Sequence, residues 1–180
     1  MTMIAELFEK GIMVMGPSRH DPAQTVGTFP PDLIPKLMAE RVAAMQAVHS
    51  MAGDWITENS VPASAHNPAY IDHGRATMEL GPSGMWICNV RNGNPVPHIT
   101  YDPFSRQWMY VLAEGAYGIV RSPGWDGDRI SFTGLMTMIG AEREFRHTIT
   151  KVSGDEFHAL NEERSADGWA YVDEWKFRRA

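Results

Sequence analysis

The segment GWAYVDEWKF, residues 168–177, alternates large aromatic side chains with smaller or charged ones. On an extended strand, every second side chain points to the same side of the sheet. The alternation therefore predicts a β-strand with one aromatic face. The residues expected on that face are Trp169, Tyr171, Asp173, Trp175 and Phe177. The carboxylate of Asp173 interrupts the aromatic row and marks a candidate functional position.

The same period of two continues from Gly53 onwards, and turn-forming residues recur about every ten residues. The turn signals are GPSG at 81–84, NGNP at 92–95, YDPF at 101–104, GWDGD at 124–128, SGD at 153–155 and SADG at 165–168. This spacing predicts an antiparallel up-and-down barrel or a sandwich of about eight to ten strands. We favour the barrel, because closing the sheet removes the edges that so many strands would otherwise expose.

Helical spacing of apolar side chains precedes the strands at two places. Residues 3–10 predict a short helix that Gly11 stops. Residues 32–51 predict a longer helix, which Asp32 can cap and which ends before Gly53. The apolar stripe of this longer helix needs a partner surface. The helix would cover the barrel as a lid or pack in a homodimer, and the sequence leaves both alternatives open.

The predicted fold class is therefore mainly β, with one or two N-terminal helices. Between the two helices, residues 16–31 are rich in Pro and Gly and predict an irregular arm. We divide the chain into residues 1–52, an arm with helices that packs on the barrel, and residues 53–180, the barrel domain.

The composition argues against several classes of protein. A chain of 180 residues is long enough for one domain with a substantial core. Its net charge of −6, spread over mixed acidic and basic residues, argues against a nucleic-acid partner. The single Cys88 allows no disulfide within the chain, which is typical of a reducing compartment. There is no apolar run long enough to span a membrane and no basic leader, so we expect a cytoplasmic protein.

Four segments, taken in their order along the chain, resemble a bacterial lipocalin-like (calycin) family, most of whose members have no known activity. These segments are MAGDWITENSV (51–61), ITYDPFSRQWMYV (99–111), GWDGDRISFTG (124–134) and DGWAYVDEWKFRR (167–179). The resemblance covers about residues 45–180 and leaves out the N-terminal arm. It implies a cup-shaped barrel that holds a small, largely apolar molecule. The same architecture also supports cofactor-free lyases, isomerases and decarboxylases, so the fold alone does not decide between binding and catalysis.

One motif within this resemblance is structural. Gly53-Asp54-Trp55 is similar to the Gly-x-Trp that opens the first barrel strand of lipocalins. In lipocalins this Trp closes one end of the barrel, and an arginine near the C-terminus stacks across it. The resemblance implies that Arg178 or Arg179 makes this cation–π contact here.

The polar residues expected inside the barrel predict the functional site. If the apolar face of each strand is the interior, the inward polar residues are Tyr110, Glu114, Tyr117, Arg121, His147, Asn161, Glu163, Tyr171 and Asp173. An unpaired carboxylate in an apolar barrel is costly. One interpretation is a structural ion pair of Asp173 or Glu163 with Arg121. The functional interpretation makes His147 a general acid or base oriented by Asp173 or Glu163, while Arg121 and Tyr117 polarise the ligand.

The remaining candidates form the wall of a ligand site. The sequence contains 12 Met and 6 Trp, which suit either an irregular core or a pocket for an aromatic molecule. The predicted ligand-binding residues are Trp108, Tyr110, Phe132, Met136, Met138, Asn161, Glu163, Tyr171 and Trp175. His73 and His98 are added because both lie near expected mouths of the barrel, where loops often carry function.

Two functions follow, together with a third, structural alternative. The barrel binds a small apolar or aromatic molecule, or it is a cofactor-independent lyase or isomerase that moves protons on an aromatic or hydroxylated molecule. The structural alternative is an interaction domain with a filled core. There is no phosphate-binding loop, zinc-protease motif or nucleophile elbow, so we expect no cofactor and no metal. The expected partner is a small molecule, with no nucleic acid and no membrane.

Overall fold

A computed structural model describes residues 3–65, 68–138 and 140–180, in two compact units, Met1–Ala43 and Ala44–Ala180. The N-terminal unit contains α1 (Met3–Glu9) and most of α2 (Leu33–Met45). It also contains a hairpin of β1 (Val14–Pro17) and β2 (Thr25–Thr28), which lies where the sequence predicts only an irregular arm. The predicted helix over residues 32–51 is α-helical in α2 and continues as the 3-10 helix η1 (Gln46–Met51).

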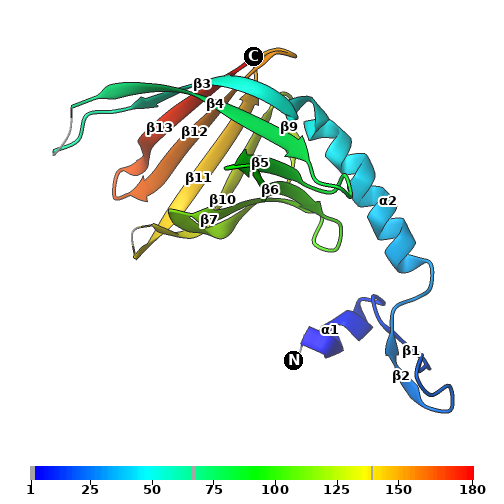
Figure 1. Cartoon of the computed structure of the whole chain (residues 1–180). Coiled ribbons are helices and arrows are strands. Elements are labelled where there is room, and N and C mark those ends of the chain that lie inside the picture. The colour runs from blue at the N-terminus through cyan, green and yellow to red at the C-terminus, as the bar shows by residue number, and fades with distance from the viewer. Residues whose placement is uncertain (1–2, 66–67, 139) are drawn as a thin grey trace. The chain divides into compact units, whose positions relative to one another are not determined.

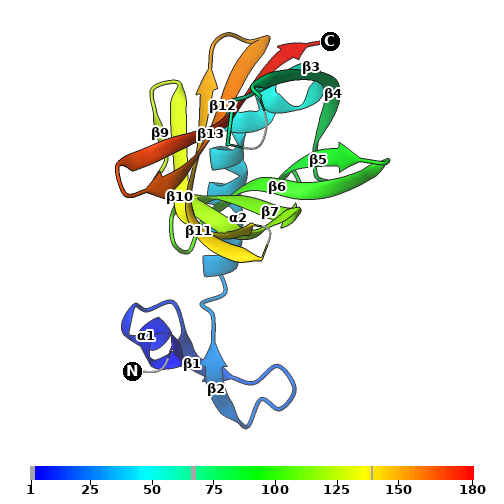
Figure 2. The same cartoon turned by 90° about the vertical axis from the view of Figure 1, so that its left-hand side faces the viewer.

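The second unit is a closed antiparallel barrel of ten strands, as the described residues form it (Figures 1 and 2). The strands are β3 (Gly53–Val61), β4 (Tyr70–Leu80), β5 (Ile87–Arg91), β6 (Asn94–Asp102), β7 (Gln107–Glu114), β8 (Ala116–Ser122), β10 (Arg129–Met138), β11 (Ala141–Lys151), β12 (Glu156–Ser165) and β13 (Gly168–Arg179). Sequence neighbours pair along the meander, β8 pairs with β10, and β13 returns to β3 and closes the ring. The short β9 (Trp125–Asp126) pairs with the start of β10. The predicted barrel is thus confirmed.

The core of this unit lies inside the barrel. Side chains that alternate along the strands point inwards, and the largest of the fully buried ones are Trp55, Ile87, Ile99, Ile130, Phe132, Met136 and Ile149. Met45, Val48 and Met51, from the end of α2 and from η1, join the same cluster. The segment just before β3 therefore contributes to the barrel core.

Trp55 and Arg179 pack together where β3 begins and β13 ends. The guanidinium carbon of Arg179 lies 4.0 Å from the centre of the Trp55 ring, which confirms the predicted cation–π contact. The Arg179 guanidinium also donates to the carbonyl oxygens of Ser50 and Ala52, each at 2.8 Å. Trp55 is 1% exposed, and its indole donates to the Met51 carbonyl at 2.9 Å. Strand β3, strand β13 and η1 are thereby joined at this end.

A bulge divides the aromatic face predicted for β13. The pairing of β12 with β13 shifts between Asn161 and Glu162, so that one extra residue, Val172, lies on β13. Beyond a bulge, side chains change faces. Tyr171 is consequently 44% exposed and does not share the inner face of Asp173. Trp169 instead lies under the guanidinium groups of two arginines, Arg146 and Arg164.

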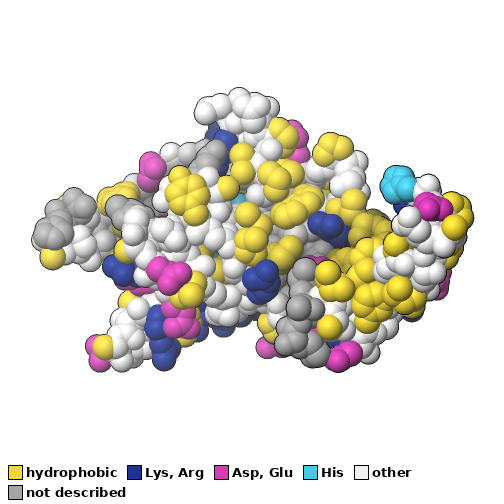
Figure 3. All heavy atoms as spheres, turned by 90° about the horizontal axis from the view of Figure 1, so that it is seen from below, with side chains coloured by type: hydrophobic (Ala, Val, Ile, Leu, Met, Phe, Trp, Pro, Cys, Tyr) yellow, Lys and Arg dark blue, Asp and Glu magenta, His cyan; other side chains and the backbone are white. Residues whose placement is uncertain are grey.

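The orientation predicted for β8 is wrong by one residue. Val120 and Ser122 are buried, whereas Tyr117 is 61% exposed and Arg121 is exposed on the outside. A Cβ at Gly118 would lie 3.0 Å from the carbonyl oxygen of Leu135 on β10, so the close approach of the two strands favours glycine at this position. Apolar side chains are also exposed on the strands, among them Ile56, Ile119 and Leu135, so apolarity alone does not identify the inner side of a strand. Figure 3 shows apolar side chains on one face of the molecule.

Candidate functional site

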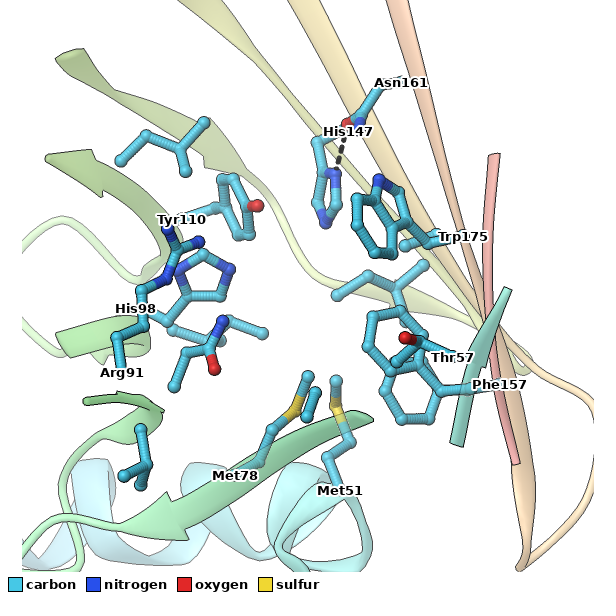
Figure 4. A pocket seen from close by; sticks show the side chains of 18 of the residues that line it. Met51, Thr57, Met78, Arg91, His98, Tyr110, His147, Phe157, Asn161 and Trp175 are labelled. Carbon is cyan, nitrogen blue, oxygen red and sulfur yellow. Dashed lines mark hydrogen bonds between the residues drawn. The ribbon is translucent and has the colours of Figure 1, made fainter. Parts of the chain in front are cut away.

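The barrel contains a cavity of about 450 Å³. Its apolar lining residues are Met51, Ala76, Met78, Val90, Ile99, Leu112, Ile149, Phe157, Ala159, Trp175 and Phe177. Its polar lining residues are Thr57, Arg75, Asn89, Arg91, His98, Tyr110, His147 and Asn161. Figure 4 shows the aromatic and sulfur-containing side chains around the open space, with the two imidazoles and the phenol on its wall. The cavity is thus mostly apolar with a few polar groups.

Three side chains from neighbouring strands form a hydrogen-bonded row. The amide nitrogen of Asn161 on β12 donates to Asp173 on β13 at 2.6 Å. The amide oxygen of Asn161 lies 2.7 Å from Nδ1 of His147 on β11. Because that oxygen can only accept, Nδ1 of His147 carries the proton and donates. Nε2 of His147 is then left with a lone pair, and Figure 4 shows the ring extending into the cavity beside Trp175.

Tyr110 on β7 lies between two imidazoles. Its ring stacks on His147 with centroids 3.9 Å apart and an angle of 21° between the planes. On its other side it meets His98 at 4.4 Å and 65°. His98 reaches this position because β6 also has a bulge: the pairing of β5 with β6 skips His98, whose neighbour Ile99 pairs with both Ile87 and Tyr110.

Desolvation keeps both imidazoles uncharged. Desolvation lowers the pKa of His147 to about 4, although the hydrogen bond to Asn161 opposes the shift. Desolvation, with smaller contributions from His147 and Arg91, lowers the pKa of His98 to about 3. Burial, helped by the charge of Asp173, raises the pKa of Tyr110 far above its usual range. At neutral pH the cavity therefore presents a lone pair on His147 and a protonated phenol on Tyr110.

Part of the predicted site comes together in this cavity. The lining includes His98, Tyr110, His147, Asn161 and Trp175. Asp173 lies behind Asn161 and is bonded through it to His147. The inward orientation of Tyr110, His147, Asn161, Asp173 and Trp175 is as expected, whereas His98 was expected near a mouth of the barrel and lies within β6. The chemical roles of all these residues remain predictions.

The other predicted site residues lie elsewhere. Those in the core or packed on it, without lining the cavity, are Trp108, Phe132, Met136 and Met138. Glu163 is 42% exposed and lies 3.8 Å from Nε of Arg143. His73 and Tyr171 are exposed, and the exposed Arg121 and Tyr117 of β8 are outside the barrel. The side chain of Glu114 lies outside the described part of the structure.

The sequence analysis missed Arg91, Asn89 and Arg75, which are among the residues that line the cavity. In β5, Asn89 and Arg91 alternate with Cys88 and Val90, so the two polar residues share a face. The alternation was available in the sequence. Placing the apolar face of β5 inside the barrel gives the wrong orientation for this strand. The outer side of β5 is also covered, and Cys88 is buried there.

Two further properties concern ions and membranes. Among the residues that the structure describes, no three His, Cys, Asp or Glu side chains cluster closely enough to hold a metal ion. Across the same residues, no helix combines the length and the apolar character that crossing a bilayer requires.

Comparison with known proteins finds similarity only among solved structures. No protein-family model matches the chain, and no curated protein matches it in sequence. The crystal structure of Rv2717c from M. tuberculosis is 12% identical, with a TM-score of 0.48, over 76% of this chain and 97% of that one. A redesigned β-barrel (11% identical, TM-score 0.34) and EF1p2_mFAP2b bound to DFHBI (11% identical, TM-score 0.37) each align with 76% of this chain and with 95% and 99% of their own. At these sequence identities and TM-scores, the structural similarities support no conclusion about function.

Removing the carboxylate of Asp173 is expected to disturb the protonation of His147. In Asp173→Ala, the Asn161 amide loses the acceptor that fixes its orientation, so His147 should change from a single Nδ1–H form to a mixture of tautomers. The lost charged hydrogen bond should also cost about 2 kcal/mol of unfolding free energy. Imidazole 15N chemical shifts measure the tautomer directly. Asp72→Ala, at an exposed carboxylate on β4, is the control; an unchanged Nδ1–H form in Asp173→Ala would contradict the arrangement.

Proposed function

We propose that the barrel binds a small molecule with an aromatic or apolar body in its central cavity. The observation that carries this proposal is the cavity itself, about 450 Å³ of space inside a closed sheet. Ligand sites commonly have this size, an apolar lining and a few polar groups that fix the orientation of the ligand. Trp175 and Phe157 supply aromatic surface, and His147 and Tyr110 supply hydrogen-bonding atoms. A filled core would leave no such space.

We also propose that the chain is a lipocalin-like (calycin) barrel. The contact of Arg179 with Trp55, directly after Gly53, supports this assignment, since the resemblance implies it. The strand order of the barrel is the up-and-down order that the assignment requires.

Catalysis by His147 is the second candidate function, and the row Asp173–Asn161–His147 favours it because it leaves Nε2 free to accept a proton. Two observations make binding the better supported function. A pKa of about 4 makes His147 a weak base at neutral pH. Arg121 and Tyr117, assigned by sequence to polarise the substrate, lie outside the barrel.

Filling the cavity tests the proposed function. Ala159 is 5% exposed and lines the cavity, so Ala159→Phe should occupy the space that a ligand needs. Calorimetric titration with charged and neutral naphthalene compounds should give saturable binding to the natural chain, weakened at least about tenfold in Ala159→Phe. Thr137→Phe, at an exposed position on the outside of β10, is the matched control. Absence of saturable binding to the natural chain would overturn the proposal.

A further inference from the structure

One wall of the cavity ends in a hydrogen-bond acceptor. The Asp173 carboxylate has no proton to donate, so the amides of Asn161 and Asn59 both turn their nitrogens towards it, at 2.6 Å and 3.4 Å. The amide oxygen of Asn161 then faces His147 and accepts from its Nδ1 at 2.7 Å. Nε2 of His147 is therefore the unprotonated nitrogen of the ring. The carboxylate thus determines, through one amide, what His147 offers to the cavity.

The hydroxyl of Tyr110 lies beside this acceptor. The rings of Tyr110 and His147 are stacked with their centroids 3.9 Å apart. Both residues are buried and both line the cavity. Figure 4 shows the phenol oxygen of Tyr110 and the ring of His147 next to each other. Because the phenol is protonated, it can donate to a ligand, whereas Nε2 of His147 can only accept from one. The wall therefore presents a donor and an acceptor side by side.

The surroundings of this pair favour an uncharged ligand group. Burial is the largest cause of the raised pKa of Tyr110, and the negative charge of Asp173 raises it by more than the positive charge of Arg91 lowers it. A hydroxyl that a ligand brought against Tyr110 would be held in its protonated form for the same reasons. It could then donate to Nε2 of His147.

We propose that the cavity selects an uncharged aromatic alcohol, a phenol-type ligand whose hydroxyl donates to Nε2 of His147 and accepts from the hydroxyl of Tyr110. This inference rests on the proposed binding function and adds the class of ligand. An aromatic amine could donate to His147, but its nitrogen is a poor acceptor for Tyr110. An ether or a ketone could accept from Tyr110, but it has no proton for His147. A hydroxyl satisfies both partners.

A pair of ligands that differ in one group tests the inference. 2-Naphthol and 2-methylnaphthalene have nearly the same shape, and only the first carries a hydroxyl. With the full-length chain and titration calorimetry at neutral pH, we expect the naphthol to bind about tenfold more tightly, or better. 2-Naphthoate, which places a negative charge on the same ring system, should bind more weakly than the naphthol.

Three variants connect the preference to the two side chains. His147→Phe keeps a ring beside Tyr110 and removes the acceptor, so the preference for the naphthol should fall to within about twofold. Tyr110→Phe removes one oxygen atom and should lower the preference about threefold, which keeps the test valid if His147→Phe does not fold. His73→Phe, at an exposed histidine on β4, is the matched control and should leave the preference unchanged.

The imidazole 15N spectrum of the natural chain gives a second readout. The naphthol should move the Nε2 resonance of His147, whereas 2-methylnaphthalene should leave it nearly in place, because it has no proton to donate. Equal affinity for these two compounds, tighter binding of the naphthoate than of the naphthol, or a preference that survives in both His147→Phe and Tyr110→Phe would overturn the inference and leave the proposed function standing. Binding of none of the three compounds would overturn both.

Discussion

Acidification from pH 7 to pH 5 is expected to reduce the unfolding free energy by about 4 kcal/mol, because two histidines inside the barrel are desolvated and uncharged. His98 and His147 have pKa values of about 3 and about 4 in the folded chain, against an ordinary value of 6.5. Between these values the unfolded chain binds protons that the folded chain does not, so stability falls as the pH falls. Each such proton changes the free energy by about 1.4 kcal/mol per pH unit.

The loss is comparable with the whole stability of many domains. Urea unfolding followed by tryptophan fluorescence at a series of pH values measures it. His147→Gln and His98→Gln should each remove about half of the slope, whatever they do to the stability at neutral pH. His73→Gln, at an exposed histidine on β4, should leave the slope unchanged. A stability that stays level down to pH 5 would show that these imidazoles are not buried in their neutral form.

Replacing Gly53 by alanine is expected to destabilise the barrel by about 3 kcal/mol. Gly53 has φ of 134°, a conformation that residues with a Cβ rarely adopt. A Cβ at this position would also overlap Nη1 of Arg179. The arginine cannot move aside without leaving Trp55 and the carbonyl oxygens of Ser50 and Ala52. Both the space and the backbone conformation at position 53 of the Gly-Asp-Trp motif thus require a glycine.

Chemical denaturation of a small set of variants separates these two reasons. Gly154→Ala is the matched control, since a Cβ there meets nothing within 4 Å. It should change the unfolding free energy by less than about 0.5 kcal/mol. In an Arg179→Ala background, Gly53→Ala should cost only the conformational part, about half of the full effect. If Gly53→Ala lowered the unfolding free energy equally with and without Arg179, the overlap between the new Cβ and the arginine would contribute nothing to the loss.

Much of the fold could be predicted from the sequence because it depends on local patterns. The period of two and the regular turns specify strands and their order, and a meander of ten strands can bury its edges by closing on itself. The Trp55–Arg179 contact could be predicted from a motif. The hairpin of β1 and β2 could not, because its sequence is dominated by Gly and Pro, which are typical of irregular loops.

The site was less predictable because it depends on single-residue shifts. Val172 and His98 are the extra residues of two bulges, and no sequence signal distinguishes them from regular strand positions. A shift by one residue exchanges the two faces of a strand, as Tyr171 and Arg121 show. The grouping of His147 with Asp173 was recognisable from alternation. Asn161 was also expected to face inwards, but its place between His147 and Asp173 became clear only once the register was known.

The incomplete pairing of β4 has a consequence for the protein in concentrated solution. A strand with unpaired backbone amides can accept a strand from another molecule, which is the first step of many aggregation reactions. Within the described chain, residues 70–76 of β4 pair on one side only, and Tyr70 and Ile71 are exposed there. The charged residues Asp72 and Arg75 lie on the same unpaired stretch, and charged side chains at such an edge oppose the addition of a foreign strand. These charged side chains would then keep neighbouring molecules apart.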